Sequence, residues 1–308
     1  MALVTGSSGF IGRHFAAHLK DQGWDVFGID IVPGEHTDAM ADARDFFRSL
    51  GLFRGGVSFA GGTDLVIHAA AVVGGRAKIE GSPLDLAVNL ELDAALFRWA
   101  RVVRPGRVVY FSSSAAYPVS LQQPQLRHRL AESDISLDEP GLPDALYGWA
   151  KLTGEHLARL ARADGLAVTV VRPFSGYGPD QDGAYPFPAF ADRALRREDP
   201  FLVWGDGSQV RDWVHVDDIV AAVTEMYRLD HNGPLNIGWG APVSLRELAG
   251  RVCAAAGYQP ALETVPAAPA GVSWRVCDPV RLWQVCRPRV PLDQGIAGVL
   301  EYRKRYLT

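Results

Sequence analysis

The chain of 308 residues has few cysteines, no long apolar run and no excess of basic charge. Its three cysteines, Cys253, Cys277 and Cys286, form no CxxC pair and have no companion histidines, so we expect reduced side chains and no bound metal. No apolar run approaches the roughly 20 residues that cross a bilayer, so we expect no membrane partner. A formal net charge of −4 without a basic stripe argues against a nucleic-acid-binding protein.

The composition is otherwise that of a well-packed globular protein. Hydrophobic residues make up 48% of the chain and charged residues 21%, and no low-complexity tract is present. The length suits a large domain together with a smaller one. A strand-like segment begins at Ala2 and leaves no room for a signal peptide, so we expect a cytoplasmic protein.

Short apolar runs alternate with helical patterns through the first half of the chain. This order predicts an α/β fold with a doubly wound parallel sheet that helices cover on both faces. The stretch 35–62 is short, rich in glycine and poor in β-branched residues, so one strand–helix unit should be reduced there. We expect strands at 2–5, 24–30, 63–71, 106–114 and 166–174, and helices at 9–22, 83–103 and 144–165.

The composition of the chain changes after Phe174. Prolines and aromatic residues become frequent, and the expected elements become short. We therefore expect a first domain over 1–174 and a smaller α/β domain over most of 175–308. The stretch at about 212–232 contains a helical pattern that we expect to return to the first domain.

Three glycines, Gly6, Gly9 and Gly12, stand three residues apart between the first expected strand and the first expected helix. In a dinucleotide-binding turn the first glycine makes the tight turn, the second admits the pyrophosphate and the third lets helix and strand pack. The second strand ends roughly 20 residues later at Asp30, where an acid holds ribose hydroxyls and repels a 2′-phosphate. The sequence therefore predicts NAD rather than NADP. Asp42 either meets the adenine edge or is an ordinary surface acid.

Hydroxyl side chains end the fourth expected strand. Ser112, Ser113 and Ser114 stand there at the carboxyl edge of a parallel sheet, the edge at which ligands bind. Downstream, Tyr147 and Lys151 are four residues apart and share one face of the expected helix. A lysine ammonium beside a phenol favours the phenolate and lowers its pKa, and a nearby serine hydroxyl orients it. This set predicts a base that takes a proton from a sugar hydroxyl as hydride leaves the carbon.

Together these features resemble the extended short-chain dehydrogenase/reductases, the nucleotide-sugar epimerase and dehydratase family. The resemblance covers nearly the whole chain. It implies a Rossmann-type NAD-binding domain, a C-terminal substrate-binding domain and a nucleotide-diphosphate sugar as substrate. It also implies a homodimer formed through the helices that contain Asn89 and Tyr147. The motifs that carry it are "TGSSGFIG", "DLVIHAAA", "FSSSAAYP", "YGWAK", "VVRPFSGYGP" and "WGDGSQVRDWVHVDDIV".

The resemblance also implies roles for individual residues. Tyr147 is the expected catalytic base, Lys151 its partner and Ser113 the third catalytic residue. Ser175 stands where the family has asparagine, which puts the substrate contact there in doubt. NAD is expected to contact Gly6, Ser8, Gly9, Phe10, Ile11, Gly12, Asp30, Asp42, Ala69, Ala70, Ala71, Asn89, Tyr147, Lys151 and Pro173. The substrate is expected to contact Val73, Ser113, Ser114, Ser175, Arg211, Arg275 and Asp278.

Each reaction of the family needs its own acid or base beside the tyrosine and lysine. A dehydratase carries an Asp-Glu pair at the positions of Ser114 and Ala115, and a decarboxylase carries a glutamate at the second of them. A 3,5-epimerase has a cysteine there and a lysine or histidine partner, which the stretch 180–190 lacks. Reversible oxidation at C4 remains, so we predict an NAD-dependent 4-epimerase.

Three alternatives stay open. The first is an NAD(P)H-dependent reductase or dehydrogenase of a 4-keto nucleotide sugar, and the second is a dehydratase or an epimerase at another carbon. The third is a non-catalytic, cofactor-sensing protein. The nucleotide also stays open between GDP and UDP, although "AAAVVGG", "SSSAAYP" and "PAGVSWRVCDPVRL" are similar to segments of GDP-fucose synthase and GDP-mannose 3,5-epimerase.

Overall fold

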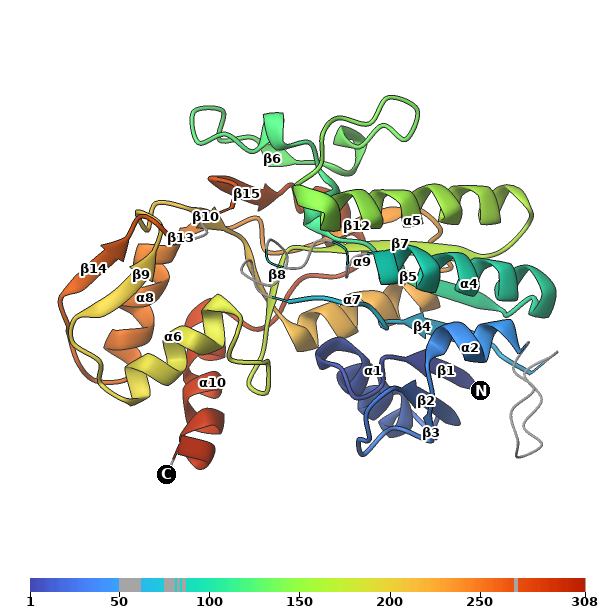
Figure 1. Ribbon diagram of the computed structural model, residues 1–308, viewed down its shortest axis with the longest axis horizontal. Helices are drawn as coiled ribbons and strands as arrows, with labels where there is room; N and C mark the ends of the chain where they lie inside the picture. The colour runs from blue at the N-terminus through green and yellow to red at the C-terminus, as the bar shows by residue number, and fades with distance from the viewer. Residues whose placement is uncertain (50–61, 75–80, 82–83, 85–86, 269–270, 308) are drawn as a thin grey trace.

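A computed structural model describes residues 1–49, 62–74, 81, 84, 87–268 and 271–307 (Figure 1). The beginning of the helix expected at 83–103 and most of the second half of the stretch 35–62 lie outside these residues. Within the described part of the chain, no helix combines the length and apolar character that crossing a membrane requires.

A parallel sheet forms the centre of the molecule, as predicted. Among the described residues it has seven strands, in the order β12-β7-β5-β4-β1-β2-β3. The three central strands of this order, β5, β4 and β1, are buried along their whole length, which explains their largely apolar sequence. The strands are β1 (Ala2–Thr5), β2 (Val26–Asp30), β3 (Ala39–Met40), β4 (Leu65–His68), β5 (Arg107–Phe111), β7 (Val168–Pro173) and β12 (Pro234–Ile237).

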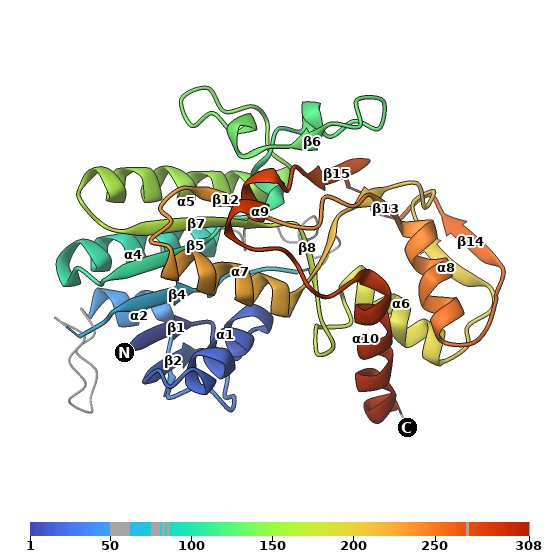
Figure 2. The ribbon, with the colours of Figure 1, turned by 180° about the vertical axis from the view of Figure 1, so that it is seen from behind.

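Helices cover both faces of this sheet. On one face α2 (Ala43–Arg48), α4 (Ala87–Val103) and α5 (Ala145–Ala163) bury a cluster that includes Phe46, Trp99 and Ala158. On the other face α1 (Phe10–Asp21), α7 (Val216–Arg228) and α9 (Val280–Val285) bury a second cluster that includes Phe15, Ile219 and Leu282. Figure 1 looks onto the first set of helices, and Figure 2, from behind, shows α7 and α9 in front of the sheet. The doubly wound α/β prediction is confirmed.

The reduced unit predicted between the second and third long strands is present. Its strand, β3, has two residues and its helix, α2, has six. Asp42 caps α2 by accepting a hydrogen bond from the backbone N–H of Arg44 at 2.8 Å.

A second group of shorter elements lies beside the sheet, on the left of Figure 1. The helices α6 (Pro186–Leu195), α8 (Leu245–Ala255) and α10 (Leu292–Leu307) enclose its apolar core. One small sheet has the order β13-β10-β15-β6, and two pairs of strands, β8 with β11 and β9 with β14, complete the group. Its strands are β6 (Arg129–Leu130), β8 (Ser175–Tyr177), β9 (Phe201–Trp204), β10 (Val210–Arg211), β11 (Trp213–His215), β13 (Val243–Ser244), β14 (Leu262–Val265) and β15 (Trp274–Cys277).

The chain passes between the two groups more often than the sequence suggested. Helix α7 lies within the stretch expected to return to the sheet, but β12 follows that stretch and also joins the sheet beside β7. In the opposite direction, β6 comes from the first half of the chain and pairs with β15. Both strands are too short to show a periodicity in the sequence. These crossings bring segments from both halves of the chain to one cavity.

Candidate active site

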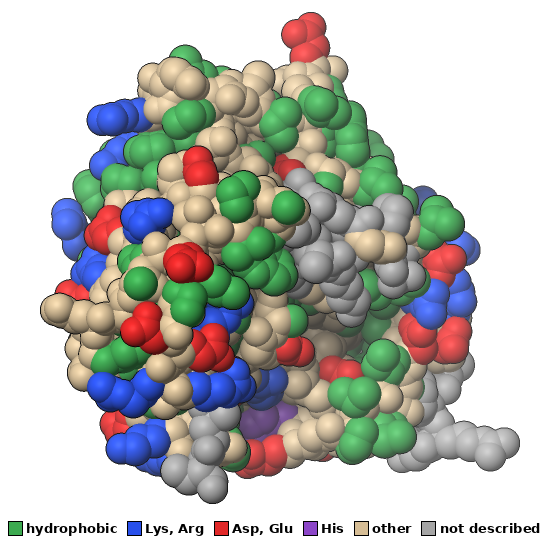
Figure 3. Space-filling model, turned by 60° about the vertical axis from the view of Figure 1, so that its left-hand side comes forward, with side chains coloured by type: hydrophobic (Ala, Val, Ile, Leu, Met, Phe, Trp, Pro, Cys, Tyr) green, Lys and Arg blue, Asp and Glu red, His purple; other side chains and the backbone are tan. Residues whose placement is uncertain are grey.

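A cavity of about 770 Å³ lies at the carboxyl ends of β1, β4, β5 and β7, between the sheet and the second group of elements. Ligands of open α/β sheets bind at this edge. Figure 3 shows a face of the molecule that is hollowed near its centre. This volume lies in the range of small-molecule and cofactor sites.

The glycine turn after β1 forms one wall of this cavity. Gly6 has a φ of +73°, and a Cβ placed on it would lie 2.7 Å from the backbone nitrogen of Ala70. The N–H of Gly9 donates to the carbonyl of Gly6 at 3.0 Å, and a Cβ on Gly12 would overlap the same carbonyl. The turn therefore requires glycine for its backbone conformation at Gly6 and for close packing at Gly12.

The turn presents open backbone donors to the cavity. Helix α1 begins at Phe10, and no side chain caps its N-terminus. Gly9, Phe10 and Ile11 all line the cavity. Free N–H groups and the positive end of a helix dipole suit a pyrophosphate, so this segment fits a dinucleotide.

Asp30 lies at the end of β2, next to the turn. Its carboxylate accepts hydrogen bonds from the backbone N–H of Ser8 at 2.9 Å and of Val32 at 3.1 Å. Ser8 and Asp30 line the cavity, beside the exposed side chains of Ile31 and Val32. This arrangement provides a carboxylate for ribose hydroxyls and an apolar surface for an adenine ring.

Asp42 also lines the cavity, but its carboxylate is already engaged. It forms an ion pair with Arg44 at 2.6 Å, and the hydrogen bond from Arg44 lowers its pKa. If Asp42 binds adenine, its carboxylate would have to do so while it also caps α2 and pairs with Arg44.

The segment after β4 forms the floor of the cavity, but one residue predicted to contact NAD does not face it. Ala69, Ala70, Ala71 and Val73 line the cavity. Asn89 is buried and absent from the lining, because its side chain is used by Val72. It accepts from the N–H of Val72 at 2.6 Å and donates to its carbonyl at 2.9 Å. In this structure Asn89 holds the segment that lines the cavity, and its direct contact with the cofactor stays a prediction.

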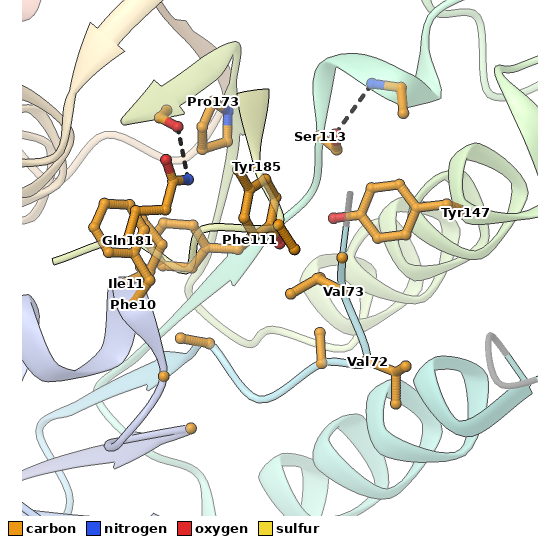
Figure 4. A pocket seen from close by; sticks show the side chains of 18 of the residues that line it. Phe10, Ile11, Val72, Val73, Phe111, Ser113, Tyr147, Pro173, Gln181 and Tyr185 are labelled. Atoms are coloured by element: carbon orange, nitrogen blue, oxygen red, sulfur yellow. Dashed lines mark hydrogen bonds between the residues drawn. The ribbon is translucent and has the colours of Figure 1, made fainter. Parts of the chain in front are cut away.

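The three expected catalytic side chains come together where β5 meets α5. Ser113 follows β5 and caps the 3-10 helix η2 (Ser114–Ala116), since its Oγ accepts from the N–H of Ala115 at 3.1 Å. Tyr147 and Lys151 project from α5, with the Lys151 Nζ 5.8 Å from the centre of the Tyr147 ring. Figure 4 shows Tyr147 and Ser113 pointing into the same space. All three residues line the cavity.

Burial dominates the electrostatics of this set. It raises the pKa of Tyr147 to about 12, although a hydrogen bond with Ser113 acts in the opposite direction. Burial also lowers the pKa of Lys151. The protein's own groups therefore do not lower the pKa of the phenol as the sequence analysis expected. An oxidised nicotinamide carries a positive charge, which would favour the phenolate.

The opposite end of the cavity is lined by arginines from the second group of elements. Arg211 donates to the carbonyl oxygens of Val210 at 2.9 Å and Val272 at 2.8 Å. Arg275 pairs with Asp144 at 2.7 Å and donates to Gln122 at 2.6 Å. These backbone and side-chain bonds fix two guanidinium groups at the cavity wall, where they suit phosphate oxygens.

The remaining predicted residues divide into two groups. Ser114, Pro173 and Ser175 line the cavity. Asp278 does not, and its carboxylate accepts from the N–H of Val280, the first residue of α9, at 2.9 Å. Gly12 is also absent from the lining and acts through its packing against Gly6. The contact of Asp278 with the substrate stays a prediction.

Sequence reasoning missed several residues of the lining. Tyr185, on the loop before α6, has a pKa raised mainly by burial and also by the nearby Tyr147. Figure 4 shows Tyr185 and Gln181 across the cavity from Tyr147. Trp204 and Phe190, from the second group of elements, add aromatic surface to the lining of the cavity. The stretch 180–190 contains no lysine or histidine. Its tyrosine was the sequence feature that could have identified Tyr185 as a residue of the cavity.

Known proteins are similar to this chain in sequence and in fold. Residues 2–238 match the NAD dependent epimerase/dehydratase family. Over 297 residues, covering 92% of this chain and 89% of the relative, the sequence is 33% identical to a dTDP-4-dehydro-6-deoxy-D-allose reductase from a Streptomyces species. It is 30% identical to the GDP-mannose 3,5-epimerase of Arabidopsis thaliana over 282 residues, covering 89% of this chain and 74% of the relative. The structure of the Thermus thermophilus UDP-glucose 4-epimerase in complex with NAD matches with a TM-score of 0.84, 27% identity and 98% coverage of both chains.

The family match agrees with the geometry of the glycine turn and of Asp30, and the similar structure was crystallised with NAD, so the cofactor prediction is confirmed. The chain is a member of the NAD-dependent epimerase/dehydratase family, which includes nucleotide-sugar epimerases, dehydratases and reductases.

Proposed function

We propose that this enzyme is an NAD-dependent nucleotide-sugar 4-epimerase. The observation that carries the proposal is the convergence of Ser113, Tyr147 and Lys151 on one cavity with the dinucleotide turn. Ala115, which is buried next to them, supplies no acid, base or thiol for elimination or for proton removal at another carbon. Ser113, Tyr147 and Lys151 are sufficient for a reversible oxidation at C4.

The chain's own residues would hold NAD along the edge of the sheet. The backbone N–H groups of Phe10 and Ile11, next to Gly9, would bind the pyrophosphate, and Asp30 would bind the adenosine ribose. Lys151 would bind the second ribose beside Ala69–Ala71. When bound, NAD would supply the hydride acceptor and donor that oxidation and reduction at C4 of the sugar require.

Tyr147 would hold the proton that leaves the C4 hydroxyl. The Oγ of Ser113 accepts from the N–H of Ala115, so its own proton is available for donation to the phenolate or to the sugar oxygen. The Lys151 ammonium supports the phenolate by its charge. The proton returns from Tyr147 to the sugar oxygen when the hydroxyl is restored, so no external acid is consumed.

The arginine end of the cavity would anchor the diphosphate of a GDP- or UDP-linked sugar. Arg211 and Arg275 are fixed by the bonds described above, whereas the sugar end is lined by Val73, Tyr185 and Gln181. A firm hold on the nucleotide and a loose hold on the sugar would let the 4-keto sugar turn over between the two hydride transfers. Binding energy would then act far from the reacting carbon.

A cytoplasmic homodimer is part of the proposal. Helices α4 and α5 lie side by side on the outer face in Figure 1. Leu90, Leu146, Trp149 and Leu160 are exposed on these two helices. Their apolar surface supports pairing with the same helices of a second copy.

A second candidate is a 4-keto nucleotide-sugar reductase, which the 33% identity to a dTDP-4-dehydro-6-deoxy-D-allose reductase favours. One experiment separates the two. Protein as purified, without added cofactor, is mixed with GDP-, UDP- and dTDP-hexoses and followed by proton NMR at the anomeric and C4 positions. A C4 epimer that accumulates to equilibrium supports the epimerase. No change, followed by turnover of a 4-keto sugar once NADH or NADPH is added, replaces it with the reductase.

A further inference from the structure

A buried carboxylate that the proposed reaction does not use lies on the other side of Tyr110 from the catalytic lysine. Asp93, on α4, is 2% exposed. Its Oδ2 accepts a hydrogen bond from the hydroxyl of Tyr110, on β5, at 2.7 Å. The Nζ of Lys151, which is 4% exposed, lies 5.4 Å from the centre of the Tyr110 ring. Three neighbouring elements therefore bring an acid, a phenol and an ammonium together in the interior.

The fold makes room for this cluster. Gly154, one turn after Lys151 on α5, faces the pair formed by Asp93 and Tyr110. A Cβ at Gly154 would lie 2.6 Å from the Oδ2 of Asp93 and would overlap the Tyr110 hydroxyl. The hydroxyl of Tyr110 also lies 3.5 Å from the carbonyl of Lys151. The contact between α4, β5 and α5 at this point depends on these polar side chains.

Other titratable groups surround Asp93, Tyr110 and Lys151, and Asp93 is the one that favours the charge of Lys151. His68, on β4, places its Nε2 3.5 Å from the Oδ1 of Asp93, while its Nδ1 pairs with the Thr5 hydroxyl at 2.8 Å. Tyr147 and Glu155 are the other titratable groups that act on Tyr110. Burial acts against the charge of Lys151, and Asp93 acts in its favour. A buried ammonium without such a partner loses its proton easily.

We infer that Asp93 is a positioning residue that keeps the Lys151 ammonium charged and directed toward Tyr147, with Tyr110 holding the carboxylate in place. The inference rests on the proposed function, because it assigns Lys151 a charged role toward the cofactor ribose and the phenol. Asp93 itself touches neither the cavity nor a reacting atom.

The test measures cofactor binding and needs no sugar. The affinity for NAD⁺, or the rate at which a retained cofactor exchanges with labelled NAD⁺, is followed as the pH is raised. In the wild type, binding weakens where Lys151 loses its proton, and this step is absent in Lys151→Met. In Asp93→Asn the step moves to lower pH, and in Asp93→Glu it returns toward the wild-type position. A step at the wild-type pH in Asp93→Asn overturns the inference, as does an equal shift in both variants.

Two further measurements keep the inference testable. If Asp93→Asn does not fold, the double variant Tyr110→Phe/Asp93→Leu removes the hydrogen-bond donor and acceptor together. The step in NAD⁺ binding is expected to move to lower pH in this variant too.

Where an active sugar is known, both limbs of the kcat/KM profile should move to lower pH in Asp93→Asn, because Asp93 raises the pKa of both Tyr147 and Lys151. A uniform loss of kcat without a shift would mean a packing role only. Failure of the 4-epimerase assignment would leave the NAD⁺ binding result unaffected.

Discussion

A Cβ placed on Gly12 would overlap the carbonyl oxygen of Gly6, because α1 crosses directly over the turn that ends β1. The obstacle is backbone, so it cannot move aside as the end of a flexible side chain would. This contact fixes the open N-terminus of α1 next to Asp30 and thereby shapes the cofactor wall of the cavity.

Gly12→Ala should therefore impair NAD binding and stability together. We expect a loss of about 1–3 kcal/mol in the free energy of unfolding, since helix and strand must separate to admit the methyl group. Gly250→Ala is the matched control, because Gly250 is also helical and no atom lies within 4 Å of its Cβ position. That variant should be neutral or more stable by up to about 1 kcal/mol. Denaturant unfolding with and without NAD⁺ measures both, and equal effects would contradict the prediction.

The pH dependence of activity should follow from Tyr147 and Lys151. Burial raises the pKa of Tyr147 to about 12, so the phenolate becomes more abundant as the pH rises from neutral. Burial lowers the pKa of Lys151, so its supporting charge is lost at high pH. We therefore expect kcat/KM to rise as the pH increases from neutral and to fall again at higher pH. Ultraviolet titration of the phenol should show a lower pKa with NAD⁺ bound, and Tyr147→Phe should remove this signal.

The same Tyr147→Phe variant separates an enzyme from a cofactor sensor. An enzyme should lose about 100-fold or more in kcat while still binding nucleotide. Unchanged activity would exclude Tyr147 as the base.

Local sequence order was enough to predict the placement of one half of the cavity lining. The glycines, Asp30, Tyr147 and Lys151 all depend on a strand, a turn or one helical repeat, and each occupies the expected place. The sheet followed from the same kind of signal, namely apolar runs that alternate with helical patterns.

The other half depended on contacts between distant segments. Asn89 and Asp278 have the expected residue type, but Val72 and Val280 use their side chains, and the sequence does not show which way they point. Tyr185 reaches the cavity through the crossing of the chain into the second group of elements. The two-residue strand β6 carries no pattern of its own.

Tyr185 should affect turnover without affecting the cofactor. Its phenol lines the sugar end of the cavity, across from Tyr147. Tyr185→Phe removes one hydroxyl, and loss of a neutral hydrogen bond to the sugar should reduce kcat/KM by about 2- to 10-fold. NAD⁺ affinity should stay at the wild-type value. A fall in NAD⁺ affinity with unchanged kcat/KM would place Tyr185 on the cofactor side instead.

Arg211 should contribute to nucleotide binding. Arg211→Met should raise KM for the nucleotide sugar by about 10- to 100-fold with a smaller effect on kcat, because a charge-assisted bond to phosphate would be lost. Arg228→Met is the control, since Arg228 is exposed on α7 and pairs with Glu225. Steady-state kinetics of both variants decide the point. An unchanged KM in Arg211→Met would exclude a phosphate contact.

The ion pair of Arg172 and Glu155 should govern stability at the centre of the molecule. Its two bonds measure 2.8 Å and 2.6 Å, both side chains are almost completely buried, and Glu155 also accepts from the hydroxyl of Ser112 at 2.5 Å. Glu155→Gln leaves the guanidinium charge buried without a counter-ion, which should cost about 3–5 kcal/mol.

An exposed ion pair provides the contrast. Asp138→Asn removes the partner of Arg159 on the surface, where water already screens both charges, and should cost less than about 1 kcal/mol. Denaturant unfolding of both variants gives the two values. Equal losses in the free energy of unfolding would mean that other acceptors satisfy Arg172 when the carboxylate is removed. The Tyr117 hydroxyl, 3.0 Å from the Arg172 Nη1, already accepts one such bond. The ratio of the two costs therefore measures how far the carboxylate, rather than the surrounding hydroxyls, keeps this charge inside the fold.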